Sequence, residues 1–359
     1  MPGGAEAQAR LKGAPRLCFF AHYQPQGIVT DCVLHYLREI RRAGFEIVVA
    51  TAAPLDEVSA ARLRSACTDL IRRENSGYDF GGWAACFAKW SPISADLLLL
   101  CNDSVYGPFG DLNGAIDRLC EEKADAYSMV GLIEQAPHLQ SWFLLLRPSA
   151  YGLPAAAALL KQAPPPSLSK SELIRSREIG LSRVLRNAGL QLRALYDPTR
   201  HGLVSRFFRF NPSHILWREL VEGAGIPFIK VELLRDNPQY VENVQKWRAL
   251  APETLRECID TDLALRRSAQ GPTPAPSFRW NRFHIKAARL VHEALRRDFR
   301  FAVAGRHGPL YANALAFIPL FLLFALSTLF NFLSRRSRNR TDPLLRAMVP
   351  RDGIEPPTP

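Results

Sequence analysis

The chain has 359 residues, of which 47% are hydrophobic, and a formal net charge of +12. This length allows one large domain or two ordinary ones, and the composition is that of a globular protein with a buried core. The seven cysteines are scattered and never spaced as C-x-x-C, which argues against a disulfide framework or a zinc site and favours a reducing cytosol. Residues 1–15 contain no apolar run typical of a secretory signal, and we expect them to be disordered.

The excess positive charge is concentrated near the end of the chain. Residues 278–307 hold a surplus of six basic side chains and residues 335–359 a surplus of three. The remaining body is only mildly basic, so the charge favours anionic lipid over a nucleic-acid groove as the partner. A nucleic-acid-binding protein, suggested by the pI alone, would have to keep its binding after deletion of residues 277–359.

The first third of the chain alternates strand-like and helix-like segments. Apolar runs bounded by turn signals predict strands, and an apolar face at helical spacing predicts a helix after the capping residue Thr30. This alternation predicts a parallel sheet with right-handed crossovers. No G-x-G-x-x-G or G-x-x-x-x-G-K-[ST] is present, which disfavours a dinucleotide dehydrogenase or a P-loop enzyme. The predicted strands are 16–22, 45–51 and 70–73, and the predicted helices are 30–43 and 55–66.

A further apolar run, residues 96–101, has the length of a buried strand and stops at Asn102-Asp103-Ser104. Ligands of open α/β sheets bind beyond the carboxyl ends of the strands. Asp103 is therefore the first candidate site residue. Its structural alternative is a turn or helix cap.

The later segments carry further polar candidates. A loop at 133–140 contains His138 and Gln140, and Glu178 opens a predicted helix at 179–187. Lys230 lies within a strand-like stretch, 228–233. The remaining segments of this part are a helix at 111–123, strands at 124–132 and 141–146, and a helix at 213–222.

The last quarter has a different character. The proline-rich residues 271–277 predict an extended linker. Residues 278–307 place a basic stripe beside apolar side chains, which predicts a membrane-surface helix, with a solvated helix packed on the main domain as the alternative. Residues 308–334 carry no charge and predict a transmembrane or re-entrant segment, whose orientation the basic flanks on both sides do not determine. We expect the basic tail, 335–359, to be disordered.

Five sequence fragments occur in an order that resembles a known family. They are NSGYDFGGW, NDSVYGPF, HLQSWF, EIGLSRVLRNAGL and NPSHILWRELVEGAGIPFIKVELLRDNP. Together they resemble the rhamnan synthesis protein F family, bacterial glycosyltransferases of cell-surface polysaccharide assembly, over about residues 16–240. The resemblance implies an A-type glycosyltransferase-like α/β domain at 16–270, with a mostly parallel nucleotide-binding sheet flanked by helices. The residues after this domain, 278–334, predict a C-terminal helical membrane anchor.

The resemblance also implies a reaction. A deoxyhexose, rhamnose from dTDP-rhamnose, would be transferred with inversion to a lipid-linked or polysaccharide acceptor of rhamnan or O-antigen synthesis. The enzyme would act at the cytoplasmic face of the plasma membrane. The alternative is a non-catalytic membrane-associated module that binds nucleotide sugar or glycan and organises a biosynthetic complex.

Sugar transfer requires a base for the acceptor hydroxyl and stabilisation of the leaving diphosphate. Glu178 or another carboxylate would be the base. His138, in the loop at 133–140, is a further candidate catalytic residue that would contact the acceptor or the transferred sugar, with a purely structural histidine as the alternative. A-type enzymes usually hold Mg²⁺ or Mn²⁺ with a D-x-D motif, whereas Asp103 is the one carboxylate of the corresponding triplet here. Asp103 is thus the candidate metal ligand, and Lys230 is an alternative partner of the diphosphate.

The remaining candidates would bind substrate. Asn75, Tyr78 and Asp79 would line the nucleotide pocket, with Gly77, Gly81 and Gly82 permitting close backbone approach. Asn102 and Ser104 flank Asp103, and Gln140 would contact the acceptor or the transferred sugar. Each has an ordinary structural alternative in a turn, a cap or a helix dipole.

Overall fold

The central strand, β1 (Arg16–His22), buries adjacent side chains on opposite faces of a sheet. The computed structural model describes residues 4–133, 136–198, 211–239 and 241–270, all within one structural unit. The Phe19 ring lies 5.2 Å from Phe87 on α4 (Tyr78–Trp90). The next ring, Phe20, lies 5.4 Å from Tyr36 on α2 (Asp31–Arg42). Because successive side chains of a strand alternate in direction, helices cover both faces of this sheet.

The strands form a mixed sheet that is mostly parallel. Its order is β3-β2-β1-β4-β8-β6, with β7 and β9 both paired to β6. The first four strands are mutually parallel, β8 runs antiparallel between β4 and β6, and β9 is parallel to β6. The bounds are β2 Glu46–Thr51, β3 Asp69–Arg72, β4 Leu97–Asn102, β6 Ala126–Leu132, β7 His138–Leu139, β8 Phe143–Leu146 and β9 Leu192–Tyr196. The predicted α/β fold with a mostly parallel sheet is confirmed.

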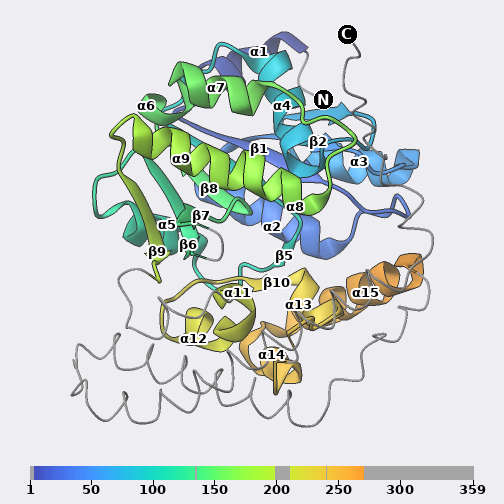
Figure 1. Ribbon diagram of the computed structural model, residues 1–359. Coiled ribbons are helices and arrows are strands. Elements are labelled where there is room, and N and C mark those ends of the chain that lie inside the picture. The colour runs from blue at the N-terminus through green and yellow to red at the C-terminus, as the bar shows by residue number, and fades with distance from the viewer. Residues whose placement is uncertain (1–3, 134–135, 199–210, 240, 271–359) are drawn as a thin grey trace, which may run out of the picture. The chain divides into compact units, whose positions relative to one another are not determined.

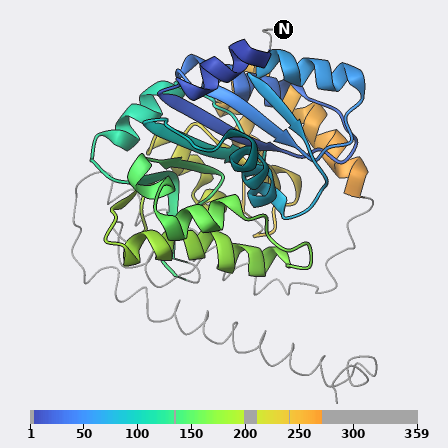
Figure 2. The ribbon, with the colours of Figure 1, turned by 90° about the horizontal axis from the view of Figure 1, so that it is seen from above.

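Helices form layers on the two sides of the sheet. One layer contains α4, α7 (Pro154–Lys161) and α9 (Gly180–Asn187), and the other contains α2, α5 (Leu112–Cys120) and α15 (Glu253–Gln270). Figure 1 and Figure 2 agree that α9 (green) and α15 (orange) lie on opposite sides of the strands. The main core lies between the sheet and the first layer and includes Phe19, Trp83, Phe87, Leu98 and Leu100.

Shorter elements complete the described chain. A two-stranded antiparallel ribbon pairs β5 (Val105–Tyr106) with β10 (Ile229–Lys230) just beyond the end of β4. A helix α8 (Lys170–Leu173) continues through a π-helical turn (Ile174–Ile179) into α9. The others are α1 Gly4–Lys12, α3 Glu57–Ala66, α6 Pro148–Tyr151, α11 Pro212–Ile215, α12 Trp217–Glu222, α13 Val231–Arg235, a 3-10 turn Val244–Lys246 and α14 Trp247–Leu250.

Several predicted elements differ from the observed ones. The expected disorder of residues 1–15 is wrong for Gly4–Lys12, because this helix buries Leu11 in the core and pairs Arg10 with Glu46 at 2.7 Å. The predicted strand at 228–233 ends at Lys230, and the following segment, rich in the helix formers leucine, glutamate and arginine, forms α13. The predicted loop at 133–140 contains the short strand β7.

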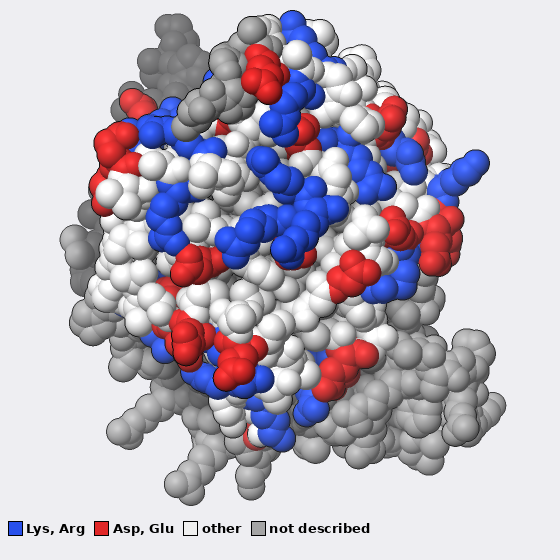
Figure 3. All heavy atoms as spheres, turned by 180° about the vertical axis from the view of Figure 1, so that it is seen from behind, with Lys and Arg blue, Asp and Glu red and all other residues white. Residues whose placement is uncertain are grey.

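The surface of the described residues carries both signs of charge. Basic and acidic side chains are nearly equal in number over these residues and lie interspersed, with one group of blue side chains near the centre of the rear view (Figure 3). Within the described ranges, no helix combines the length and apolarity required to cross a bilayer. The predicted linker 271–277, basic helix 278–307, apolar segment 308–334 and tail 335–359 lie outside the described residues.

Candidate functional site

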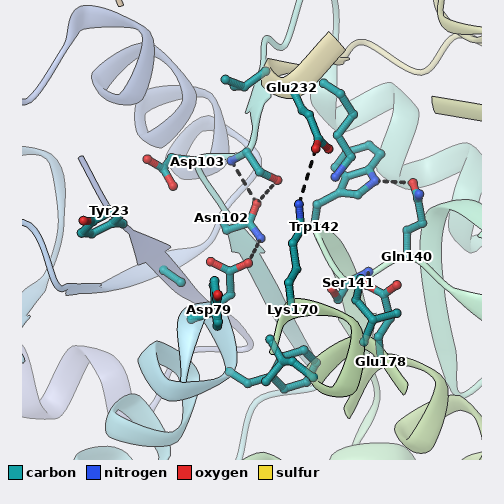
Figure 4. A pocket seen from close by; sticks show the side chains of 18 of the residues that line it. Tyr23, Asp79, Asn102, Asp103, Gln140, Ser141, Trp142, Lys170, Glu178 and Glu232 are labelled. Carbon is teal, nitrogen blue, oxygen red and sulfur yellow. Dashed lines mark hydrogen bonds and ion pairs between the residues drawn. The ribbon is translucent and has the colours of Figure 1, made fainter. Parts of the chain in front are cut away.

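The carboxyl ends of β1 and β4 form one wall of a pocket. These strands are parallel neighbours, with Ala21 opposite Asn102. The residues that follow each strand, Tyr23 and Asp103, therefore lie at the same edge of the sheet. A pocket of about 490 Å³ opens there (Figure 4).

The residues predicted from the sequence converge on this pocket. They come from the N-terminus of α4, the end of β4, the segment around β7, the π-helical turn before α9, and β10. Asp79 and Asp103 thus face one cavity, as a shared donor site requires. The predicted residues that line it are Asn75, Tyr78, Asp79, Asn102, Asp103, Ser104, His138, Gln140, Glu178 and Lys230.

The Asn102 side chain connects two of these residues. Its Nδ2 donates to Asp79 Oδ2 at 2.7 Å, and its Oδ1 accepts from the Ser104 backbone N–H at 3.1 Å and from Ser104 Oγ at 2.6 Å (Figure 4). Asn102 is only 2% exposed. Both ends of its amide are engaged with protein, so Asn102 positions Asp79 and Ser104.

Asp79 is a carboxylate in an unfavourable electrostatic environment. Burial raises its pKa to about 6, and the neighbouring charge of Asp103 acts in the same direction. Lys230 and the hydrogen bond from Asn102 partly oppose this rise. A carboxylate of this kind exchanges a proton close to neutral pH.

Glu178 is held by hydrogen bonds on both of its oxygens. Oε1 lies 3.1 Å from His138 Nε2, while Oε2 accepts from the Ser141 backbone N–H at 2.8 Å and from the Ser141 hydroxyl. Burial alone would raise its pKa, but the contacts with His138 and Ser141 outweigh burial, and the pKa of Glu178 is lowered. Glu178 is therefore ionised at neutral pH.

His138 bridges Glu178 to the backbone. Its Nδ1 lies 2.6 Å from the Ala136 carbonyl oxygen. Both ring nitrogens thus face acceptor oxygens, so a proton on either nitrogen can be donated to one of them. The side chain is 3% exposed, so His138 acts on the pocket through Glu178.

The helix that carries Glu178 begins earlier than predicted. Ser169 and Glu172 form a capping box, and the chain is helical from Lys170 onwards. Glu178 thus lies inside a π-helical turn instead of opening a helix, and a first-turn dipole role is excluded. Single π-helical turns within helices are frequent at functional sites.

Gln140 and Lys230 both contact Trp142, and all three residues line the pocket. Gln140 Oε1 accepts from Trp142 Nε1 and from Ser213 Oγ, both at 2.6 Å, and its Nε2 donates to Asn211 Oδ1 at 3.1 Å. Both lone pairs of Oε1 and one of the two Nε2 hydrogens are therefore engaged with protein, and Gln140 orients Trp142.

Lys230 is a cation that lies among the pocket carboxylates. Its Nζ lies 5.4 Å from the centre of the Trp142 ring. Burial lowers its pKa to about 8, while Glu178, Glu232 and Asp79 act in the opposite direction. A partly desolvated ammonium group is well suited to bind a phosphate oxygen.

The predicted nucleotide loop folds around its glycines. Gly77 has φ +68°, and a Cβ there would meet Pro164 Cδ at 2.8 Å. A Cβ on Gly81 would lie 2.2 Å from the Ser76 carbonyl oxygen. These glycines therefore permit close packing against Pro164 and Ser76, and Tyr78, which begins α4, is 53% exposed at the pocket.

The geometry around Asp103 does not fit a preformed divalent metal site. Its Oδ2 lies 2.9 Å from Nη2 of Arg266. A cation bound there would share the carboxylate with a guanidinium group. Across the described residues, no cluster of three or more histidine, cysteine, aspartate or glutamate side chains could hold a metal ion.

Comparison with known proteins identifies the family. A family model described as rhamnan synthesis protein F matches residues 47–263, which is more than half of the chain. The chain belongs to the rhamnan synthesis protein F family. The resemblance derived from the five fragments is confirmed, with a match that starts later and extends further than expected.

The relatives of this rhamnan synthesis protein F family member are distant. It is 29% identical to virulence protein VirA of Vibrio anguillarum over 204 residues, 49% of this chain and 65% of that protein. It is 29% identical to the uncharacterized protein y4gN of Sinorhizobium fredii over 203 residues, 55% of this chain and 52% of that protein. The chain therefore spans about half to two thirds of the length of these curated relatives. Among solved structures, S. aureus TarS 1–349 is similar with a TM-score of 0.33 and 11% identity, over 80% of this chain and 81% of that one.

The pocket of this family member contains residues that sequence reasoning missed. His22 Nδ1 lies 2.9 Å from Thr51 Oγ1, whereas its buried Nε2 has no partner among the described residues. Tyr23 is 40% exposed at the same edge. Both follow from the rule applied to Asp103, since polar residues at the end of β1 are as informative as those at the end of β4. Arg266, on α15, carried no sequence signal.

Proposed function

We propose that this protein is a glycosyltransferase of cell-surface polysaccharide synthesis. Its donor would be a nucleotide-linked deoxyhexose, rhamnose from dTDP-rhamnose, and its acceptor a lipid-linked or polysaccharide chain. Family membership supports the reaction class. The observation that carries the proposal is the convergence of an ionised glutamate, a cationic lysine and two aspartates in one pocket at the carboxyl edge of the sheet.

In the proposed reaction Glu178 is the general base. It accepts the proton of the acceptor hydroxyl while that oxygen bonds to the anomeric carbon of the sugar. The bond between this carbon and the diphosphate oxygen breaks at the same time, the nucleoside diphosphate leaves, and the configuration inverts. His138 and Ser141 orient Glu178 and keep it ionised.

Lys230 would stabilise the leaving diphosphate. Its ammonium group is desolvated in the pocket, where an interaction with developing negative charge is stronger than in water. Tyr78, exposed at the pocket, would stack on the nucleobase, with Asn75 beside it. The Mg²⁺ or Mn²⁺ site at Asp103 stays a prediction, and no step here depends on it.

The proposed location is the cytoplasmic face of the plasma membrane. It rests on the basic residues 278–307 and the uncharged residues 308–334. A lipid-linked acceptor is confined to the membrane plane, so an anchored enzyme would meet it more often. Flotation of the full chain with lipid vesicles, and loss of flotation without residues 278–359, tests this location.

A donor panel tests the reaction itself. The purified protein is incubated with nucleotide sugars and a lipid-linked acceptor extract, and the products are analysed by mass spectrometry. A deoxyhexose added from dTDP-rhamnose supports the full proposal, and addition from another donor retains the enzyme class while correcting the sugar. The competing function is a non-catalytic module, favoured by the single carboxylate of the Asn102-Asp103-Ser104 triplet. Such a module would bind donor without transfer or hydrolysis.

A further inference from the structure

Arg266 connects α15 to the pocket. Its Nη2 lies 2.9 Å from Asp103 Oδ2 and its Nε lies 2.7 Å from Asp262 Oδ2. The three side chains are 11%, 10% and 2% exposed, in the order Arg266, Asp103, Asp262. Arg266 and Asp103 both line the cavity, and Arg266 lies beyond the last residue of the family match.

Asp262 fixes this arginine from the side away from the pocket. Its Oδ2 also accepts from Tyr106 Oη at 2.6 Å, and its Oδ1 accepts from Thr30 Oγ1 at 3.1 Å. Asp262 therefore joins α15 to β5 and to the start of α2. A guanidinium group bound on two edges by fixed carboxylates has little freedom to move.

The charges of Asp103 and Asp262 are partly balanced by Arg266. Asp103 and Asp262 contribute two negative charges and Arg266 one positive charge, while burial lowers the pKa of the neighbouring His22 and keeps it neutral. Removal of Arg266 would leave two close carboxylates without the arginine that pairs with both of them, at a pocket that must accept a diphosphate. Like charges at low exposure repel strongly, so the loss would act on ligand binding directly.

We infer that Arg266 is a positioning residue of the nucleoside diphosphate site, holding Asp103 in place and neutralising it, so that α15 is an integral part of that site. The inference rests on the proposed function for the identity of the ligand. Asp103 would use its second oxygen to accept a hydrogen bond from a ribose hydroxyl of the donor.

The test measures binding of dTDP and UDP to the full chain by titration calorimetry. Arg266→Gln is expected to weaken binding by about tenfold or more. Arg266→Lys keeps the charge but cannot bond both carboxylates as the planar guanidinium does, and it is expected to weaken binding by about threefold. The matched control is Arg267→Gln. This arginine precedes Ser268 on the same helix, bonds the Leu234 carbonyl oxygen at 2.9 Å and does not line the pocket, so its loss should leave binding unchanged.

A double-mutant cycle separates positioning from general stabilisation. In the Asp103→Asn background, Arg266→Gln should weaken binding by no more than about twofold, because the carboxylate that it positions is already absent. Equal losses in the two backgrounds, or an equal loss in Arg267→Gln, would overturn the inference. If Arg266→Gln does not fold, Arg266→Lys decides, and unchanged affinity in that variant contradicts the inference.

The result also distinguishes this inference from the proposed function. A wild-type protein that binds neither dTDP nor UDP would overturn the inference. A protein that binds them with the predicted dependence on Arg266, but transfers no sugar, would support the inference and contradict the proposed enzyme.

Discussion

Asn102 holds Asp79 through a hydrogen bond of 2.7 Å between its Nδ2 and Asp79 Oδ2, and thereby joins the end of β4 to the first turn of α4. This contact brings two of the sequence fragments that resemble the family, around Asp79 and around Asp103, together. Asp79 is consequently held, partly buried, near Asp103, and its raised pKa follows from that placement.

Asp79→Asn should change how stability depends on pH. The pKa of Asp79 is about 6 in the folded protein, above its ordinary value of 3.8, so its contribution to stability is fully present below pH 3.8 and is lost as pH rises through 6. The variant lacks this loss and can still accept the bond from Asn102. We expect it to be more stable than wild type at pH 8 by roughly 1–3 kcal/mol, with little difference at pH 4.

Urea denaturation at the two pH values measures this difference. Asp56→Asn serves as the control. The exposed Asp56 carboxylate caps α3 and has a lowered pKa, so the stability difference between this variant and wild type should change with pH in the opposite direction. A stability difference for Asp79→Asn that does not grow with pH would show that Asp79 is not held in an unfavourable ionised state.

Glu178→Gln should remove transfer and retain donor binding. The amide keeps the size of the side chain and can still accept from Ser141, but it cannot take the proton of the acceptor hydroxyl. We expect kcat to fall by about 10²-fold or more, with the dTDP affinity within about threefold of wild type. Exposed Glu172→Gln, on the preceding α8, is the matched control and should leave kcat unchanged.

The pH profile of kcat/KM identifies which carboxylate is the base. A base must be deprotonated, so activity falls as pH falls through its pKa. With Glu178 as the base the decline lies below the usual range of a carboxyl group, because its pKa is lowered. A decline centred near pH 6 would instead assign the role to Asp79.

Lys230→Met should weaken nucleoside diphosphate binding and slow transfer. The methionine keeps the unbranched shape beside Trp142 and removes the ammonium group. We expect a loss of about tenfold or more in dTDP affinity that becomes smaller at high salt, where the wild-type interaction is itself screened. Lys161→Met, at the exposed end of α7, should have no effect, and an equal loss there would point to a general charge effect.

Two glycines with similar backbone angles test the nucleotide loop. Gly77 has φ +68° and Gly189 has φ +78°, but only a Cβ on Gly77 would meet other atoms within 4 Å. Gly189→Ala should cost about 1 kcal/mol of stability from backbone strain alone. Gly77→Ala should cost more and should also weaken dTDP binding, because it displaces the start of α4 and Tyr78. Equal effects of the two variants on stability and binding would contradict the packed loop.

The sequence was sufficient to predict many of the residues that reach the pocket, but not all of them and not what each side chain contacts there. The strand-end rule placed Asp103 correctly because parallel strands end at one edge. It could not reveal that Gln140 is occupied by Asn211 and Ser213, about seventy residues away, since hydrogen-bond partners at that separation leave no periodic trace. Arg266 was missed for the same reason, as 163 residues separate it from Asp103.

One incorrect prediction, the start of the helix that contains Glu178, could have been avoided from the sequence. The helix containing Glu178 was predicted to start at that residue, although Ser169 and Glu172 have the S-x-x-E spacing of a capping box. Recognition of this signal would have placed Glu178 within a helix. The π-helical character of its turn depends on tertiary contacts and has no comparable signature.

The central claim is that the pocket transfers a sugar, and comparison of wild type with Asp103→Ala tests it most directly. Both proteins receive dTDP-rhamnose with a lipid-linked acceptor extract, and the elongated acceptor, free rhamnose and bound nucleotide are measured together. The account predicts an acceptor lengthened by one deoxyhexose with wild type and a lower kcat/KM with Asp103→Ala, because Asp103 belongs to the proposed donor site. Wild-type protein that binds the donor but forms neither elongated acceptor nor free sugar, with this or any other nucleotide sugar, would contradict it.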